Sequence, residues 1–296
     1  MLKKYQSSLT LTFLFTILIL YLTKSELIIK EFLNYTNIFI TKLFPTTFII
    51  YIFSNIFIEY GIINKLSKIF KNKASTIYII VMSIISGFPS GPKHIKDLLT
   101  RNYITLDQAN YLIYFTHFPN PLFILGTVSM IISSKIQTLK LFISLLLSNF
   151  VTALLISKPK YQSIEIPNYK EKDFSSVLSD SIISSLKISL LIYGTSIFFY
   201  LIATLINNYL NLSLTSYIIL NAFFDLTKGI TLTSLITNET FKSIFIILLI
   251  SIGSLNINIQ IKSILTDTSI KYSNFLKGRL ISTIFAIIIY LIIKNL

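Results

Sequence analysis

The chain contains no cysteine and no tryptophan among its 296 residues. The first absence excludes disulfide bonds, a thiol nucleophile and any cysteine-based metal site. The second leaves tyrosine, with 17 copies, as the aromatic residue suited to a membrane interface. The H-E-x-x-H, G-x-S-x-G and Walker-type signatures are also absent. We therefore expect a protein that is not an enzyme and has no cofactor and no bound metal.

Charged residues are scarce, at 13% of the chain, whereas 53% of its residues are hydrophobic. A soluble domain carries about 25% charged residues. A helix that spans a bilayer needs about 20 predominantly apolar residues. Runs close to that length occur at 9–23, 44–58, 139–156, 182–206, 244–252 and 281–293. The predicted fold class is an all-α polytopic membrane protein, with the lipid bilayer as its main partner.

The net charge of +14 comes from lysines that cluster in short hydrophilic segments, near 65–73 and 158–172. Basic loops of this kind follow the positive-inside rule, so they indicate a cytoplasmic location rather than nucleic-acid binding. We expect a cytoplasmic N-terminus with a retained first helix, because no small-residue cleavage site follows the first apolar run.

The only long hydrophilic connector, 158–178, divides the chain into two halves and is also predicted to be cytoplasmic. The first half, 1–157, is expected to hold helices near 9–23 and 34–60, a broken segment at 75–115, and helices at 122–132 and 139–156. Pro45 predicts a kink in the second of these helices. The second half, 179–296, is expected to hold helices near 182–206 and 214–235, a broken segment at 241–280, and a helix at 280–293.

Two interruptions of the apolar pattern stand out, a Gly/Pro-rich run at 86–94 and an Asn-rich run at 253–260. Lipid cannot hydrogen-bond a freed backbone group, so non-helical backbone at membrane depth persists only inside protein or beside a watery cavity. A pair of such breaks, one in each half, is the sequence mark of a transporter-type binding site.

An internal repeat is suggested at an offset of 166 positions (253 − 87), where Gly87 aligns with Gly253 and Lys96 with Lys262. Glu59 aligns with Asp225 at the same offset. If the broken segments are re-entrant hairpins the repeats are parallel, and if each crosses the membrane they are inverted. We favour inverted repeats.

The first break supplies four candidate ligand-binding residues: Gly87, Ser90, Gly91 and Lys93. Backbone N–H groups freed there, together with the serine and the lysine, suit a polar or anionic ligand. The alternative is a tight loop between helices with its lysines at the cytoplasmic surface.

Three amides follow the second break, Asn256, Asn258 and Gln260. Their period-2 spacing would place them on one side of an extended segment, facing a hydroxyl- or base-bearing ligand. The alternative is that they satisfy helix ends or a neighbouring helix.

Asp225, with Thr227 and Gly229 beside it, is a candidate for contact with a ligand or a coupling cation, H⁺ or Na⁺, because ionisable groups in membrane segments are expensive. Its alternative partner is Lys228. Asn120, between two prolines, is a further candidate, with helix capping as its simpler role.

Three acidic or histidine positions remain. For Glu59 we expect an interfacial pair with Lys65, and for His94 and His117 interfacial or hydrogen-bonded positions rather than metal ligation.

Four runs carry a family resemblance: SGFPSGPK at 86–93, PLFILG at 121–126, DLTKGI at 225–230 and GSLNINIQ at 253–260. The chain resembles the YlbJ-type sporulation integral membrane proteins. That group has nucleoside-recognition "Gate" domains and is similar to parts of concentrative nucleoside transporters and of ferrous-iron transporters. The resemblance implies the cell membrane of an endospore-forming bacterium and a role in the spore cortex or envelope. Asp225 stands where the family usually has glutamate, and Pro92 where it has a small residue.

Two functions follow from these observations. The first is a transporter or permease for a small polar solute needed in spore envelope formation. The alternative is a non-transporting membrane scaffold or receptor, with a homo-oligomer or envelope-assembly proteins as its partners.

Overall fold

The computed structural model describes residues 2–159 and 172–296, and every regular element in these ranges is helical. The expected linker 158–178 lies largely outside the described residues. The first half contains α1 (Leu2–Thr23), α2 (Ser25–Ile38), α3 (Phe44–Glu59), α4 (Ile62–Phe70), α5 (Ala74–Ser86), α6 (Ser90–Thr100), α7 (Leu106–Leu112), α8 (Pro121–Gly126) and α9 (Lys135–Leu155). The second half contains α10 (Phe174–Tyr209), α11 (Leu214–Phe224), α12 (Leu226–Leu232), α13 (Glu239–Ile252), α14 (Leu255–Leu265) and α15 (Tyr272–Ile293).

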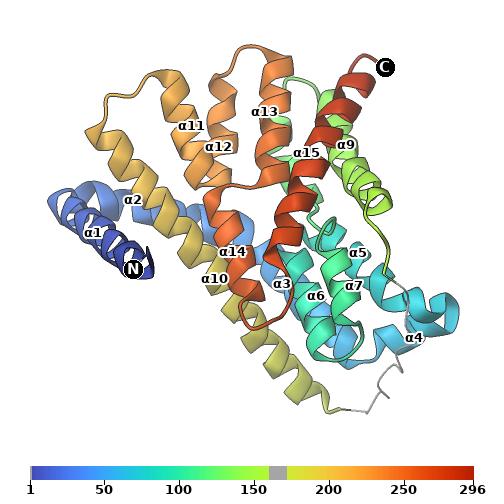
Figure 1. Cartoon of the computed structure of the whole chain (residues 1–296). Coiled ribbons are helices and arrows are strands. Elements are labelled where there is room, and N and C mark those ends of the chain that lie inside the picture. Colours follow the sequence, from blue (N-terminus) through green and yellow to red (C-terminus); the bar gives the residue numbers. More distant parts are fainter. Residues whose placement is uncertain (1, 160–171) are drawn as a thin grey trace.

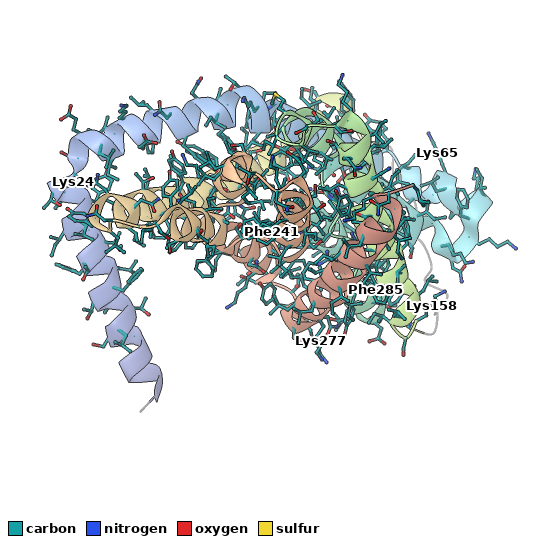
Figure 2. All side chains as sticks on the ribbon, turned by 90° about the horizontal axis from the view of Figure 1, so that it is seen from above. Lys24, Lys65, Lys158, Phe241, Lys277 and Phe285 are labelled. Atoms are coloured by element: carbon teal, nitrogen blue, oxygen red, sulfur yellow. The ribbon has the colours of Figure 1, made fainter. Side chains whose placement is uncertain are left out.

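The protein is a multi-pass membrane protein. Within the described residues, five helical segments are long and apolar enough to cross a bilayer, or six if the bent pair α1–α2 counts as one span. That pair bends by 97°, and Figure 2 shows α1 leaving the body of the molecule beyond Lys24. A π-helical turn, Phe39–Leu43, follows α2 and precedes Pro45, where the sequence predicted a kink.

The helices are apolar on the outside and partly polar on the inside, as a bilayer requires. On α9 the exposed side chains include Leu147 and Leu154, whereas Ser144, Ser148 and Asn149 are buried. Small and polar residues at helix interfaces allow close packing and interhelical hydrogen bonds, while leucine gains nothing by leaving lipid.

The first break is the turn of a hairpin, α5–α6. The two helices pack side by side, and the hydroxyl of Ser75, at the start of α5, donates to the carbonyl of Tyr103, just after α6 (2.9 Å). Both ends of the hairpin therefore lie on one side of the molecule. We call this the lower side, as drawn in Figure 1, and it also carries Glu59 and Arg101.

A second hairpin, α11–α12, enters from the opposite side and turns at Asp225. Gly229, four residues after the turn, lies so close to Ala222, three residues before it, that a Cβ on Gly229 would be 2.5 Å from the Ala222 Cα. The chain then reaches Glu239, which accepts from Ser133 (2.9 Å) on the upper side. Figure 1 shows the connections on either side of this hairpin at the top.

Two interrupted helices cross the whole body. One consists of α7, the stretch 113–120 and α8, and rises from Asn110, which accepts from the Lys271 amide on the lower side (2.8 Å). The other is α13–α14, broken at Gly253, which descends from Glu239 to the loop holding Asp267, 3.5 Å from Lys96. Helices α9 and α15 complete the two halves and pack along each other.

Among the described residues, each half therefore contains a helical hairpin, then an interrupted helix, then a final helix, and the two hairpins enter from opposite sides. At the offset of 166, Gly87 and Gly253 both have a positive φ and both precede a helix of 11 residues. The surrounding helices pack differently, however, because Gly87 lies in a hairpin turn whereas Gly253 interrupts a crossing helix. The element order pairs α5–α6 with α11–α12 instead.

The opposite entry of the two hairpins predicts a labelling pattern. Single cysteines at Asn72 and Asn102, which flank α5–α6, should react with a membrane-impermeant thiol reagent from one side only. Cysteines at Asn211 and Ser234, which flank α11–α12, should react only from the other side. All four side chains are exposed, and the native chain has no cysteine to interfere. Labelling of both pairs from the same side would contradict this arrangement.

Candidate functional site

One cavity lies where the turns of the two hairpins meet the two interrupted helices, and we call it the main cavity because of this position. Its volume is about 310 Å³. The polar residues that line it come from six parts of the chain: Lys42 and Thr47 near the start of α3, Ser86 at the first break, Asn120 and Thr127 around α8, Ser196 on α10, Thr227 on α12, and Asn256 and Gln260 on α14. Leu226, Ile257 and Phe123 are among its apolar lining.

The first break is closed by its own side chains rather than open to a ligand. Gly87 has φ 71° and ψ −176°, a conformation almost restricted to glycine, and a Cβ there would lie 2.5 Å from Asn120. The Ser90 hydroxyl donates to the Gly87 carbonyl, and a Cβ on Gly91 would lie 1.9 Å from the Thr116 carbonyl oxygen. Three other residues of this segment, Ser86, Phe88 and Pro89, line the cavity, whereas none of the four predicted ligand-binding residues does.

The second break is shorter than the sequence predicted. Only Gly253 and Ser254 leave the helix, and Leu255–Leu265 is helical, so the prediction of an extended segment with three amides on one side is wrong. Asn256 and Gln260, four residues apart on a helix, both line the cavity. Asn258 points elsewhere: its amide donates to the carbonyls of Ile252, Gly253 and Ser254 and caps the broken turn.

Asp225 lies at the tip of the second hairpin and is fully buried. Its carboxylate accepts hydrogen bonds from the Tyr35 hydroxyl (3.0 Å), the Asn256 amide (2.8 Å) and the Lys228 backbone N–H (2.8 Å). The Lys228 ammonium instead lies 5.7 Å from the centre of the Tyr200 ring. Asp225 thus sits directly behind Asn256, while Thr227 reaches the cavity and Gly229 packs on Ala222.

Asn120 has the predicted capping role, and it also lines the cavity. Its side-chain oxygen accepts from the Leu122 amide (2.8 Å) and so caps α8. Its side-chain nitrogen donates to the Ser86 carbonyl (3.2 Å), which ties the interrupted span to the first hairpin.

From the sequence we did not identify Ser196, which lines the cavity, or Arg279, which supports one of the interrupted helices. The Ser196 hydroxyl accepts from both Asn256 (3.1 Å) and Gln260 (3.0 Å), whereas the Gln260 oxygen, although buried, has no hydrogen-bond partner among the described residues. Arg279, buried on α15, donates to the carbonyls of Tyr114 (2.7 Å) and His117 (3.4 Å) in the non-helical stretch 113–120. Each is a polar residue inside an apolar helix, and that is the signal that could have found it.

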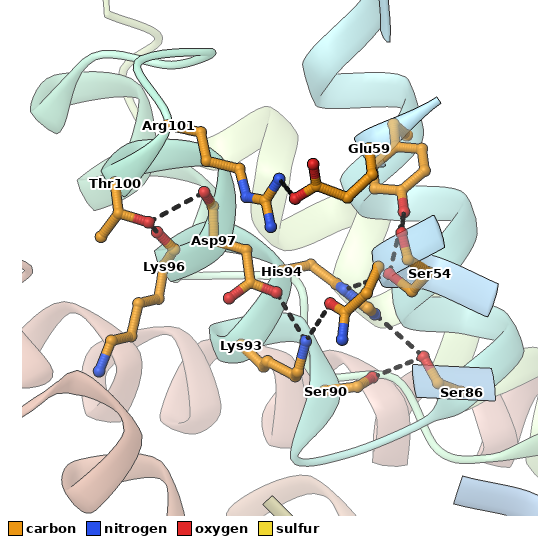
Figure 3. Close-up of polar contacts among 12 residues, drawn as sticks. Ser54, Glu59, Ser86, Ser90, Lys93, His94, Lys96, Asp97, Thr100 and Arg101 are labelled. Carbon is orange, nitrogen blue, oxygen red and sulfur yellow. Dashed lines mark hydrogen bonds and ion pairs between the residues drawn. The ribbon is translucent and has the colours of Figure 1, made fainter. Parts of the chain in front are cut away.

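A buried polar network leads from the first break toward the lower side (Figure 3). His94 lies between Ser54 (3.1 Å) and Ser86 (3.2 Å). The Lys93 ammonium, expected to contact a ligand or the cytoplasmic surface, instead donates to Asn55 (3.1 Å) and Asp97 (2.6 Å).

Glu59, four residues after Asn55 on α3, pairs with Arg101 and with Lys172 rather than with Lys65. Burial by itself raises the pKa of Glu59, but the hydrogen bonds from Lys172 and Arg101 outweigh it and hold the pKa below its ordinary value. The carboxylate is therefore charged at neutral pH.

The chain is similar to the sporulation integral membrane protein YlbJ of Bacillus subtilis (strain 168), with 21% identity over 84% of this chain and 73% of that protein. The similarity supports a distant relationship to sporulation membrane proteins, as the sequence motifs indicated. No family model matches the chain, and no solved structure matches it.

The contact between Gly87 and Asn120 predicts an unequal effect of two Gly→Ala substitutions. Gly87→Ala should lower the melting temperature in detergent by several degrees, because it combines a strained backbone costing about 1–3 kcal/mol with a clash at the Asn120 backbone. Gly194→Ala is the control, since a Cβ there meets nothing within 4 Å and alanine favours a helix. Equal melting temperatures for the two variants would contradict this account of the break.

Proposed function

We propose that this protein is a permease for a small, uncharged polar solute and that it acts during sporulation. One observation carries the proposal: two oppositely directed hairpin turns and two helix interruptions meet at one cavity of about 310 Å³. Broken helices that converge near the middle of a membrane are the construction used by secondary transporters to bind solutes.

The lining indicates the solute's chemistry. Amides and hydroxyls dominate its polar part, from Asn120, Asn256, Gln260, Ser196 and Thr227, and the one charged side chain, Lys42, is exposed. Such groups pair with hydroxyl, carbonyl or amide functions, and the apolar remainder suits a ring or carbon skeleton. A nucleoside or a sugar-type precursor has this combination, and the cavity is at the small end of the range for ligand sites.

Transport also requires access from each side in turn. We propose that the two halves are inverted repeats, because the order of hairpin, interrupted helix and final helix recurs with opposite sidedness. Inverted repeats give a protein two related conformations, each opening the same site to one side.

Asp225 is the candidate for coupling to H⁺ or Na⁺. It is fully buried, and its contact with Asn256 joins it directly to the cavity wall. Binding of a cation or proton at Asp225 would change the orientation of Asn256 and thereby the affinity for the solute.

The sporulation role rests on the similarity to YlbJ, whose name describes it as a sporulation integral membrane protein. A solute needed to build the spore cortex or envelope fits this setting. The scaffold alternative predicts instead that residues of the cavity are dispensable for spore formation.

The unpartnered oxygen of Gln260 gives the sharpest test of the cavity. Gln260→Leu should weaken binding of the best solute in a nucleoside and sugar panel by about tenfold or more, because a buried polar group on the ligand loses its partner. Binding would be followed by thermal shift and uptake in reconstituted vesicles. Asn37→Leu, which alters an exposed amide on α2, should leave both unchanged. Spore formation and uptake that survive Gln260→Leu would favour the scaffold.

Coupling through Asp225 predicts a second, separable effect. Asp225→Asn retains an acceptor for Tyr35 but removes the charge, so the folded protein should still bind solute while uptake no longer responds to a proton or sodium gradient. The comparison is uptake with and without each gradient in the same vesicles. Unchanged gradient dependence would eliminate Asp225 as the coupling residue.

A further inference from the structure

A second cavity, of about 230 Å³, lies on the lower side between α3, α6 and α10. It is lined by Asn55 and Glu59 of α3, by Arg101 beyond α6, and by Ser181 and Ser184 of α10. The main cavity is lined by earlier residues of α3 and later residues of α10, Thr47 and Ser196. These two helices pack along each other, and both therefore run from one cavity to the other.

The interface between the two cavities is polar and buried. Ser185 and Ser189 of α10 are 0% and 1% exposed, and Tyr51 of α3 is 0% exposed. The hydroxyls of all three, together with the Asn55 side-chain nitrogen, have no hydrogen-bond partner within the part of the chain that the structure describes. The unpartnered oxygen of Gln260 marks the main-cavity end of the same row.

Close helix packing alone does not explain these serines. Hydroxyls buried in membrane helices ordinarily donate to a carbonyl of the preceding turn, as Thr195 and Thr204 do on α10 itself. On α9, Ser144 donates to the Leu141 carbonyl and Ser148 to the Leu145 carbonyl. A buried polar group without a partner destabilises the folded state, and water that lies between polar walls removes that cost.

The third wall of the interface is α6, which adds charge. The Lys93 ammonium lies 5.4 Å from the centre of the Tyr51 ring and 3.1 Å from the Asn55 oxygen. Asp97, its ion-pair partner, is partly exposed. A charged pair in this position is far less costly next to water than in a dry interface.

Tyr51 obstructs this row at the main cavity. Its ring packs in a small apolar cluster with Phe39 and Ile192, and Ile192 itself lines the main cavity. The cluster is the apolar interruption between the polar groups on either side.

We propose that the interface of α3, α6 and α10 is a hydrated passage between the main cavity and the lower side, closed in this conformation by Tyr51 packed on Ile192. The passage rests on the proposed function, since it supplies the solute's route from the site to one side of the membrane.

Thiol accessibility tests the passage without knowledge of the solute. In reconstituted vesicles, Ser185→Cys and Ser189→Cys should react with a small cationic methanethiosulfonate from the lower side at least tenfold faster than Ser144→Cys and Ser148→Cys. The control serines are equally buried, at 0% exposure each, but have hydrogen-bond partners. Rates for Ser185→Cys and Ser189→Cys as slow as the controls would overturn the passage, and this comparison needs no change at Tyr51.

The closure is tested by Ser196→Cys in the main cavity. Tyr51→Ala should raise its reaction rate from the lower side at least tenfold, whereas Tyr51→Phe, which keeps the ring, should not. A rate unaffected by Tyr51→Ala in a folded protein would overturn the closure. Solute uptake that survives Gln260→Leu would count against the proposed function and leave these thiol rates unaltered, so the two failures can be told apart.

Discussion

Backbone hydrogen bonding in a medium that offers none is the constraint on which this structure depends. A helix interrupted at membrane depth frees carbonyl and N–H groups that lipid cannot satisfy. Side chains form hydrogen bonds with the backbone groups freed at these interruptions. Asn120 caps α8, Asp225 caps α12, Asn258 caps the turn at Gly253, and Arg279 binds the carbonyls of 113–120. The freed backbone groups at these breaks are therefore hydrogen-bonded within the protein, and the breaks meet at one cavity.

Some residues of the broken segments shape the cavity through packing or capping, and others line it. Gly87, Gly91 and Gly229 allow backbones to approach too closely for any side chain. Lys93 and Asn258 have their polar atoms engaged by neighbours. Asn256 and Gln260 line the cavity and both donate to Ser196, but Asn256 is also engaged by Asp225 and by the Ile257 amide. The Gln260 oxygen is left without a hydrogen-bond partner among the described residues. Polar residues in the broken segments thus fall into two groups, and only the smaller group is available to a solute.

The sequence indicated which segments form the site but not which partner each side chain contacts. The cap at Asn120 and the break in regular α-helix before Pro45 follow from local chemistry and occur where expected. The extended segment predicted at 256–260 is absent, because these residues form a helix. A helix satisfies its own backbone hydrogen bonds inside a membrane, and this outweighs the period-2 spacing of three amides. Glu59 was paired with Lys65 from nearness in sequence, whereas its partners Arg101 and Lys172 come from distant segments.

The sequence alone determined that this chain lies in a membrane, because its long apolar runs suit a bilayer. It also indicated where the helices break, because glycine, proline and asparagine affect the backbone only within a few residues of their own positions. Tertiary structure decided which break is a hairpin and which is a crossing. It also decided which amides line the cavity and that Tyr51 packs against Ile192 of α10. These outcomes depend on which helices pack together, and packing joins residues whose separation along the chain carries no local signal.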